Sequence, residues 1–432
     1  MFVSSSNEPS RVGPRRADAA RVRAHNTSVI LHHAWEEGEI SRVELARRSG
    51  LARSTVSGIV AELVDIEVLN ESHVARSSGG RPPIVLQFDG DHYRLLGIDF
   101  GATHVSVALT DLRGGVLAWR SRLHPVQKDP EGTLGLALVL VGQVLGEAGA
   151  GLDDVVGIGL GVPSPVDHDD PDHLSERILP AWETVRPGSW LSRRLDLPVF
   201  VENDANLGAL AEAWLGAGRT HPSLAFIKLG TGVGAGLVVN GEVFRGAHGF
   251  AGEIGHTAID STGPRCACGL HGCLQVLVGS EAILTGVQER IDAGASTALA
   301  SRGPLTLQAL ALAAVEGDAL ARDAVAEAGR YLGIAVANLF NLMNPSLVVL
   351  GGSLSAAGDL LLEPLRDAIR ARALWASIAQ ADVLVGTLGE QTAALGAATL
   401  VLRAALANPT MFTDRYRARA AGTESTARAA HT

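Results

Sequence analysis

The sequence lacks most features of an exported or membrane protein. Its first residues, M-F-V-S-S-S-N-E-P-S-R, have no apolar core, so we expect no signal peptide. The most apolar stretch, residues 331–352, is interrupted by three asparagines and a proline and does not fit a membrane span. Only 19% of residues are charged, and this composition does not suggest disorder. We therefore expect a cytoplasmic protein without a membrane partner, and its 432 residues predict more than one domain.

Cysteine is scarce, and all three cysteines lie within the eight residues C-A-C-G-L-H-G-C, at Cys266, Cys268 and Cys273. An odd number of cysteines in a chain without export features argues against a disulfide framework. Three thiolates and one imidazole form the ligand set of a closed tetrahedral zinc site. The imidazole is that of His256 or of His271, and we favour His256 because it would pin a separate segment to the loop. We expect one structural zinc ion per chain, and the alternative is a loop of inert cysteines.

The chain has a net charge of −10, which by itself disfavours binding to nucleic acid. The charge is unevenly distributed, because residues 1–82 contain eleven arginines and ten acidic residues. Five of these arginines precede residue 25. An acidic body with an arginine-rich beginning is compatible with a DNA-binding protein whose basic groups are local.

Residues 26–65 show the pattern of three short helices, the first ending at Gly38. Ser41 and Glu44 form a capping-box pattern at the start of the second helix, and Gly50 is suited to end it. The third helix has one apolar face and a polar leading edge, which is the pattern of a helix-turn-helix. Its apolar face would consist of Val56, Ile59, Val60 and Leu63. Its DNA-contacting residues would be Arg53, Ser54, Thr55 and Ser57.

Two strands of a wing are predicted after the third helix. Residues 68–74 and 84–88 alternate in polarity and are joined by S-S-G-G-R-P-P, in which Arg81 could enter a minor groove. The sequence thus predicts a winged helix-turn-helix domain over residues 19–90, preceded by a disordered arm of residues 1–18. The alternative is a small helical module for protein interactions with a flexible linker.

The body contains two similar stretches, each an apolar strand that breaks at glycines and returns as a second strand. They are L-L-G-I-D-F-G-A-T at residues 95–103 and G-T-G-V-G-A-G at residues 230–236, after the strand 224–229. Such turns expose N–H groups that can hold phosphate oxygens. The chain has no P-loop, and a strand rather than a helix follows the second turn, which disfavours a Rossmann fold. We expect a duplicated α/β body with a nucleotide-sized cleft, its lobes spanning residues 94–216 and 217–402, and a disordered tail at residues 405–432.

Polar residues at the ends of the predicted body strands are candidates for the site. Asp204 follows the strand 199–201 in E-N-D-A-N, where its carboxylate could act as a general base toward a sugar hydroxyl or could cap the next helix. Glu253 and His256 lie in G-E-I-G-H, directly before the cysteine loop. If zinc binds one ring nitrogen of His256, the other could donate to a ligand hydroxyl, and Glu253 would share that ligand or only support the histidine.

These motifs resemble those of the ROK family of repressors, open reading frames and sugar kinases. The matching stretches are I-D-F-G-A-T, V-E-N-D-A-N, G-T-G-V-G-A-G, G-E-I-G-H and C-A-C-G-L-H-G-C-L. The family's fold is similar to the two-lobed hexokinase and actin class, which is ribonuclease H-like. The head resembles the winged helix of the family's regulators, in S-R-V-E-L-A-R-R-S-G-L-A-R-S-T-V-S and G-G-R-P-P, so that the resemblance covers residues 20–402.

The resemblance implies roles for individual residues. Zinc would be held by the four residues already named, and Asp204 would be the base of a kinase. If a nucleotide binds, its phosphates would lie near two turns, at Asp99, Gly101, Thr103, Gly230, Thr231, Gly232 and Gly234. A sugar would be bound by Asn203, Asp204, Glu253, His256 and Gln275.

Three positions depart from the family pattern. Ala102 replaces a glycine where the backbone would meet phosphate, which bears on catalysis. Gln275 stands where glutamate is usual; its amide can bind a sugar hydroxyl but carries no charge, which bears on the identity of the sugar. Glu67 replaces the glycine expected after the recognition helix.

Two functions compete. The first is a DNA-binding regulator, a repressor of genes for carbohydrate uptake or metabolism, whose body senses a sugar or sugar derivative. The second is an ATP- and Mg²⁺-dependent kinase of a hexose or N-acetylhexosamine with an appended head. We favour the regulator because some 90 residues precede the first phosphate turn, and we expect a homodimer or homotetramer on double-stranded operator DNA.

Overall fold

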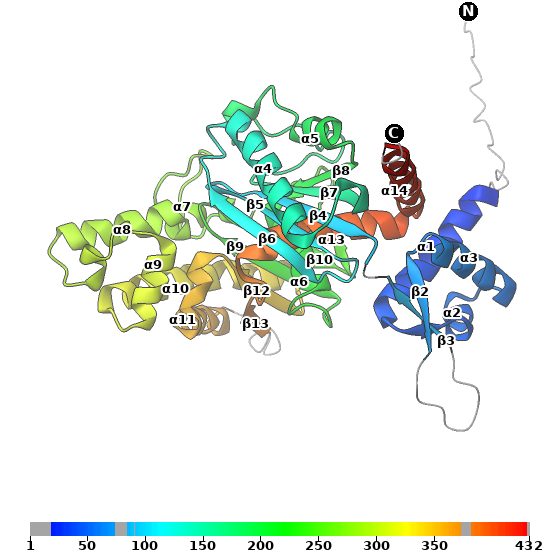
Figure 1. Cartoon of the computed structure of the whole chain (residues 1–432). Helices are drawn as coiled ribbons and strands as arrows, with labels where there is room; N and C mark the ends of the chain where they lie inside the picture. Colours follow the sequence, from blue (N-terminus) through cyan, green and yellow to red (C-terminus); the bar gives the residue numbers. More distant parts are fainter. Residues whose placement is uncertain (1–18, 74–83, 90, 373–381, 430–432) are drawn as a thin grey trace, which may run out of the picture. The chain divides into compact units, whose positions relative to one another are not determined.

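The computed structural model describes residues 19–73, 84–89, 91–372 and 382–429, with no side-chain description beyond residue 421 (Figure 1). The chain divides into two compact units. One comprises residues 1–92 together with 404–432, and the other comprises residues 93–403. The expected arm at residues 1–18 and the loop containing Arg81 lie outside the described residues.

The first unit contains a winged helix-turn-helix, as the sequence predicts. Its sheet has the antiparallel order β1-β3-β2, in which β2 and β3 form the wing. All four residues of the predicted apolar face of the third helix are buried, together with Leu45 and Ile30. The elements are α1 (Ala19–Glu37), β1 (Ile40–Ser41), α2 (Arg42–Ser49), α3 (Arg53–Asp65), β2 (Leu69–His73) and β3 (Ile84–Phe88).

The predicted capping box forms only in part. The Ser41 hydroxyl accepts a hydrogen bond from the Glu44 N–H at 3.2 Å, and Gly50 ends α2 with a φ of 68°. The Glu44 carboxylate does not return to the start of the helix, because Arg47 and Arg48 lie one turn away and donate to it. These hydrogen bonds lower the pKa of Glu44 to about 2. Arginine neighbours therefore outcompete the backbone for this carboxylate.

The C-terminal segment differs from the disordered tail expected for residues 405–432. Helix α13 (Thr392–Ala407) continues to Ala407, and α14 (Thr410–Ala429) follows a short break. Within the first unit, Arg419 of α14 donates to the His92 carbonyl at 2.8 Å and binds the Glu67 carboxylate. These contacts join residues more than 320 positions apart in the sequence, so local composition could not reveal them.

The body contains two five-stranded sheets of the same plan, which confirms the predicted duplication. The sheet orders are β6-β5-β4-β7-β8 and β11-β10-β9-β12-β13; in each, an antiparallel hairpin at one side adjoins strands that run parallel. The first lobe has β4 (Arg94–Phe100), β5 (His104–Thr110), β6 (Val116–Leu123), α4 (Pro130–Ala148), β7 (Val155–Val162), α5 (Pro187–Leu195) and β8 (Val199–Asn203). The second has β9 (Ser223–Leu229), β10 (Val233–Val239), β11 (Glu242–Val243), β12 (Leu347–Gly351) and β13 (Asp382–Val385).

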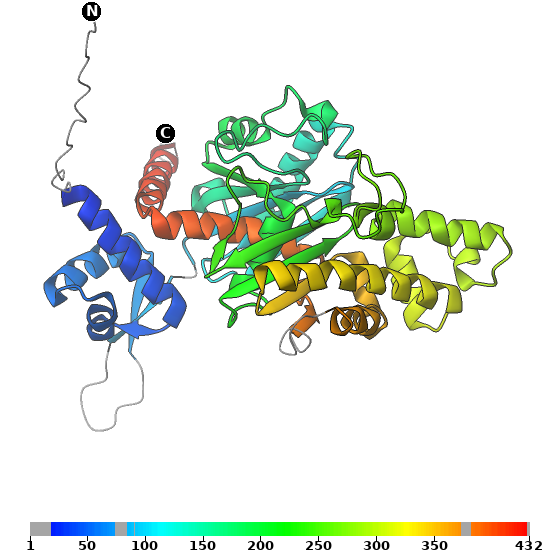
Figure 2. The same ribbon diagram turned by 180° about the vertical axis from the view of Figure 1, so that it is seen from behind.

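Further helices cover the second lobe, and the long α10 lies beside α11 (Figure 2). They are α7 (Gln275–Val278), α8 (Ser280–Asp292), α9 (Leu307–Val315), α10 (Ala319–Met343) and α11 (Asp359–Arg370). Their apolar faces form the larger core of the body with one face of the second sheet.

Two helices tie the lobes together. Helix α6 (Asp204–Trp214) follows the first sheet but packs on the second, and α13 follows the second sheet but packs on the first. The packing is close enough that a Cβ at Gly236 would lie 2.2 Å from the Ala205 carbonyl oxygen, and one at Gly159 would lie 1.9 Å from that of Ala397. Because α6 begins at the residue after β8, this crossing places its first turn between the lobes.

Helix α4 has the length and composition of a membrane span, as does the bent pair of residues 389–407 and 410–421 when counted together. The inward face of α4 is buried in the core of the first lobe, with Leu134, Leu140, Val141 and Val144 among the buried residues. Its apolar character is thus explained by packing on β5 and β6.

Candidate functional site

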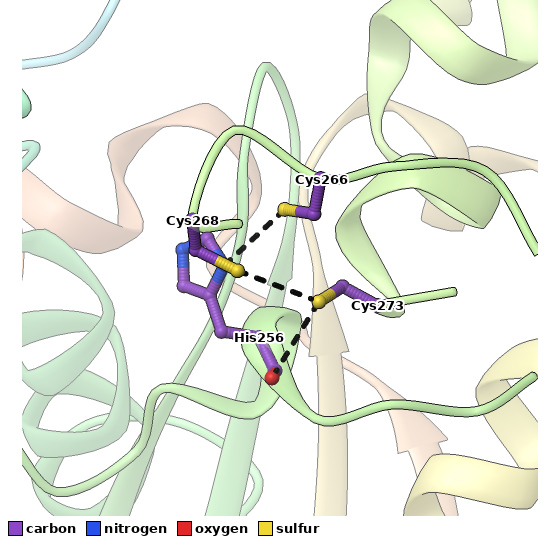
Figure 3. Close-up of side chains that lie close together, drawn as sticks. All are labelled: His256, Cys266, Cys268 and Cys273. Atoms are coloured by element: carbon purple, nitrogen blue, oxygen red, sulfur yellow. Dashed lines mark hydrogen bonds between the residues drawn. The ribbon is translucent and has the colours of Figure 1, made fainter. Parts of the chain in front are cut away.

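A four-residue cluster that could hold a metal ion lies in the second lobe (Figure 3). The candidate ligand atoms of His256, Cys266, Cys268 and Cys273 all lie within 4.8 Å of one another. Cys268 and Cys273 are separated by 3.6 Å between their sulfurs, and Cys266 Sγ is 3.6 Å from His256 Nδ1. Tetrahedral zinc with Zn–S bonds of about 2.3 Å requires sulfurs about 3.8 Å apart, so these residues fit such an ion.

The geometry decides which of the two candidate histidines can be the fourth ligand. His256 belongs to the cluster, whereas His271 lies 3.2 Å from the Gly263 carbonyl oxygen and outside it. The Leu270 N–H lowers the pKa of Cys268 to about 7, and burial raises the pKa of Cys273 to about 12. A buried thiolate needs a nearby cation, and a bound divalent ion would provide one.

Asn203 and Asp204 lie at the junction of β8 and α6. The structure makes Asn203 the cap of the helix, whereas one interpretation of the sequence gave that role to Asp204. Asn203 is the helix N-cap, because its Oδ1 accepts from the N–H groups of Ala205 at 2.9 Å and Asn206 at 3.1 Å. Its Nδ2 donates to the Ser164 carbonyl at 3.1 Å. Asp204 is the first helical residue, so the interpretation of its carboxylate as the cap is wrong. Its side chain remains available for another partner.

That partner is a lysine that the sequence interpretation did not consider. Lys228 of β9 donates to Asp204 Oδ2 at 2.5 Å, and the Asp204 residue is only 8% exposed. Burial raises the pKa of Asp204, against the attraction of Lys228. Burial would lower the pKa of Lys228, but attraction to Asp204 and Asp99 raises it above its ordinary value. The ammonium therefore stays charged beside the carboxylate.

Asp99 also has a partner within the chain. It lies at the end of β4, 2% exposed, with Oδ2 3.1 Å from His104 Nε2. A Cβ at Gly101 would lie 2.1 Å from the His104 ring, so the imidazole lies against the turn. Burial raises the pKa of Asp99, but the His104 hydrogen bond and the attraction of Lys228 lower it below its ordinary value. Of the other predicted phosphate contacts at this turn, Thr103 is exposed.

The glycine-rich turn between β9 and β10 is held by Gln275. Its Oε1 accepts from the Val233 N–H at 2.7 Å, and its Nε2 donates to the Thr231 carbonyl at 3.2 Å. Both ends of the amide thus bind backbone, whereas the sequence predicts a sugar contact. A glutamate would keep the first hydrogen bond but would place an acceptor against the Thr231 carbonyl.

Two glycines of this turn have no packing requirement within the described chain. The nearest atom to a Cβ at Gly230 would be 4.0 Å away, and at Gly232 3.7 Å away, and neither residue has a left-handed φ. Gly234 is closer to its surroundings, at 3.4 Å from Ala205 Cβ. Glycine at 230 and 232 leaves the backbone open to close approach by a ligand.

Glu253 and His256 are exposed, and the carboxylate of Glu253 lies within electrostatic reach of Asp204 and of His256. His256 turns Nδ1 toward the cysteines, which leaves Nε2 for a separate partner. The structure therefore brings together three of the predicted sugar ligands, Asp204, Glu253 and His256. Asn203 directly precedes Asp204 in the chain.

A second charged pair lies beside this group. Glu202 is 5% exposed and accepts from Arg245 Nε at 2.6 Å and from Asn206 Nδ2 at 2.9 Å. The pair lines a hollow of about 630 Å³ that also contacts His168 and Phe200. The sequence assigned no individual role to Lys228, His104, Glu202 or Arg245, and of these only Glu202 lies in one of the quoted motifs. The sequence signal that could have identified them is a charged or ionisable residue within or beside an apolar strand.

The predicted DNA-contacting residues lie at the start of α3 and on its outer side. Arg53, Ser54 and Ser57 are exposed, and Thr55 is half-buried. The helix has one buried face and leaves these polar groups outward, which is the arrangement a recognition helix requires.

The fold defines a two-lobed sugar-kinase-like body combined with a DNA-binding head. Residues 95–404 match the model of the ROK family, and residues 25–69 match that of winged helix-turn-helix DNA-binding domains. The chain belongs to the ROK family.

Its relatives include regulators and kinases. It is 31% identical to the xylose repressor of Caldicellulosiruptor bescii, over 89% of this chain and 97% of the repressor. It is 30% identical to NagC of Escherichia coli strain K12, a DNA-binding transcriptional dual regulator, over 89% of this chain and 94% of NagC. A ROK family transcriptional regulator described as a homologue of the E. coli MLC protein superimposes with a TM-score of 0.78 and 30% identity, covering 92% of this chain and 99% of that one. A ROK family glucokinase from Streptomyces griseus, in complex with glucose and AMPPNP, has a TM-score of 0.64 and 30% identity, covering 71% of this chain and 98% of the kinase.

Proposed function

We propose that this protein is a sugar-responsive DNA-binding repressor of genes for carbohydrate uptake or metabolism, acting in the cytoplasm. The observation that carries the proposal is the union of an exposed recognition helix with a kinase-like body in one chain. The likeness to a solved regulator extends over 92% of the chain, whereas the likeness to the glucokinase extends over 71%. Curated relatives over 89% of the chain are named as repressors or regulators.

The sugar or sugar derivative binds at the first turn of α6, where Asp204, Glu253 and His256 come together. Asp204 Oδ2 accepts from Lys228, and a carboxylate has further acceptor positions that can serve a ligand hydroxyl. A hydroxyl-rich ligand fits donors and acceptors of this kind, and charged acceptors make its stronger hydrogen bonds. Asn203 shapes the site by capping α6, and Gln275 shapes it by holding the glycine-rich turn.

One zinc ion per chain binds His256 and the three cysteines as a structural ion. It fixes the tautomer of His256 and orients the other ring nitrogen toward the sugar. Four protein ligands leave no open coordination position, so the ion supplies no catalytic water.

The DNA partner is a two-fold symmetric operator, bound by a homodimer or homotetramer. Arg53, Ser54, Thr55 and Ser57 enter the major groove, and Arg81 of the wing reaches the adjacent minor groove. Two heads on half-sites one helical turn apart, or a multiple of it, supply the affinity that one winged helix lacks.

The second candidate function is an ATP-dependent sugar kinase. Its support is the open backbone at Gly230 and Gly232. A selection of binding sites from random duplex DNA tests the main proposal. We expect the full-length protein to enrich an inverted repeat. Enrichment of no sequence, together with turnover of ATP and sugar to a sugar phosphate, would favour the kinase.

A further inference from the structure

Lysine is rare in this protein, since the 432 residues include only Lys128 and Lys228, against many arginines. Lys128 is exposed. Lys228 lies on β9, at the centre of the second sheet, and its side chain is 26% exposed. A charged residue in such a strand costs free energy unless it is paired, so its position requires an explanation.

The ammonium of Lys228 lies among the acidic residues that a kinase of this fold would use. It donates to Asp204 at 2.5 Å and attracts the Asp99 carboxylate as well. Asp99 Oδ1 is buried and has no hydrogen-bond partner within the described residues. This group of residues thus contains one cation and one carboxylate oxygen without a hydrogen-bond partner within the described residues, while His104 contacts Asp99 Oδ2.

We propose that Lys228 is a built-in cation that takes the place of a divalent metal ion between Asp99 and Asp204, so that the cleft binds its sugar without Mg²⁺·ATP and transfers no phosphoryl group. This inference rests on the proposed sugar site and defines what that site does with its ligand. Lys228 acts through the two carboxylates and is a positioning residue.

Phosphoryl transfer would require the carboxylates of Asp204 and Asp99, which Lys228 binds or attracts. Metal ions bridge the phosphate oxygens and neutralise their charge, and a carboxylate accepts the proton of the attacking hydroxyl. An ammonium that binds Asp204 and lies within electrostatic reach of Asp99 repels a metal cation entering the same position. It also lowers the tendency of Asp204 to accept a proton, since the ion pair would be lost.

Sugar binding survives under the same arrangement. Lys228 contacts only one oxygen of Asp204, so the other can accept from a hydroxyl without breaking the ion pair. Binding through hydrogen bonds alone needs neither metal nor nucleotide. The residues of a kinase cleft therefore serve here as a receptor.

The test compares Lys228→Met with wild type and with Lys128→Met, an exposed control. Melting temperatures of the full-length proteins are measured with and without millimolar Mg²⁺ at constant ionic strength. Wild type and the control should not respond to Mg²⁺. Lys228→Met leaves two carboxylates without their cation, so Mg²⁺ should raise its melting temperature by a few degrees. An equal Mg²⁺ response in wild type, or no response in the folded variant, would overturn the inference.

Two further variants keep the test decisive if Lys228→Met does not fold. Lys228→Gln keeps a polar group and should also gain a Mg²⁺ response, whereas Lys228→Arg keeps the charge and should remain insensitive. Formation of a sugar phosphate by wild type with Mg²⁺·ATP would sink the inference even if sugar still released DNA. Conversely, DNA binding that ignores a bound sugar would end the repressor proposal while leaving the Mg²⁺ result intact.

Discussion

At the residue scale, Asp204 and Lys228 form an ion pair, so a substitution that removes one charge leaves the other charge unpaired. Asp204→Asn removes the charged acceptor for the sugar and also leaves the Lys228 ammonium without its nearest counter-charge. Breaking one partner of a buried pair costs about 3–5 kcal/mol, and less where solvent reaches the lysine as it does here. The two effects must therefore be separated.

We predict that Asp204→Asn abolishes or strongly weakens the sugar response and lowers the free energy of unfolding. Operator binding in the absence of sugar should remain. The double variant Asp204→Asn/Lys228→Met should recover part of the stability, because no unpaired charge is left, but it should recover none of the sugar response. Sugar titration calorimetry and denaturant unfolding measure the two quantities. Unchanged sugar affinity in Asp204→Asn would remove this carboxylate from the binding site.

Glu67 is strained but paired. It adopts a φ of 61°, the left-handed conformation that the expected glycine would adopt freely, and its carboxylate binds Arg419 of α14. The left-handed conformation costs a residue with a Cβ about 1–2 kcal/mol, and an ion pair that is only partly buried contributes up to about 1 kcal/mol.

The balance predicts different outcomes for two substitutions at this position. Glu67→Ala keeps the strain and loses the ion pair, so it should destabilise the protein by about 1 kcal/mol. Glu67→Gly loses the pair but relieves the strain, so its free energy of unfolding should stay within about 0.5 kcal/mol of wild type. Denaturant unfolding measures both, and an alanine variant more stable than the glycine variant would contradict this account.

At the scale of elements, the proposed zinc site takes its candidate ligands from two segments. His256 ends a short 3₁₀ turn, and the cysteines follow within residues 266–273. An ion bound there would join these segments, so the proposal links metal binding to local stability.

We predict that freshly purified protein contains about one zinc ion per chain. Cys268→Ser should lower both zinc content and melting temperature, since serine is a poor zinc ligand. His271→Ala is a suitable control, because His271 lies outside the cluster, and it should keep its zinc. Elemental analysis that finds no zinc in protein prepared without chelators would contradict the metal assignment.

Periodicity in the sequence predicted the elements whose partners are local. The spacing of apolar residues identified α3, and the two glycine turns identified the hairpins β4–β5 and β9–β10. It did not predict α14, whose Arg419 contacts depend on residues far away in the chain. The first helix begins at Ala19, whereas the sequence placed its start near Asn26. The earlier start was not predicted because residues 19–25 show no apolar periodicity.

The candidate site was predictable to the extent that its motifs lie at strand ends. Asp204, Glu253, His256 and the cysteines were identified in this way, and the structure brings them close together as groups. Their partners were not, because pairing of Lys228 with Asp204 requires α6 to cross onto the second sheet. The bonds from Gln275 to the glycine-rich turn likewise join segments more than 40 residues apart.

At the scale of the whole molecule, the proposal couples sugar binding in one unit to DNA binding in the other. The chain passes between the units twice, near residue 92 and near residue 403. A ligand can shift the equilibrium between two arrangements only by its differential affinity for them. Sugar that closes the two lobes would alter the spacing of paired heads and weaken their fit to two half-sites.

Substitutions on α3 should affect DNA binding alone. We predict that Arg53→Ala and Ser54→Ala each weaken operator binding by about 1–3 kcal/mol if their side chains reach base edges. Sugar affinity and melting temperature should stay at wild-type values, because both positions are exposed. Glu36→Ala, also in the head but on α1, serves as a control that should bind operator normally. Equal operator affinity in all three variants would place the contact surface elsewhere.

The central claim is that a sugar controls the affinity of this protein for its operator. The direct measurement is fluorescence anisotropy of a labelled operator, with full-length protein at fixed salt, with and without a saturating sugar identified by thermal shift. Allosteric coupling in proteins is typically about 5- to 150-fold, so we predict that sugar weakens operator binding within that range. Operator affinity that saturating sugar leaves unchanged, or that persists after deletion of residues 1–92, would contradict the account.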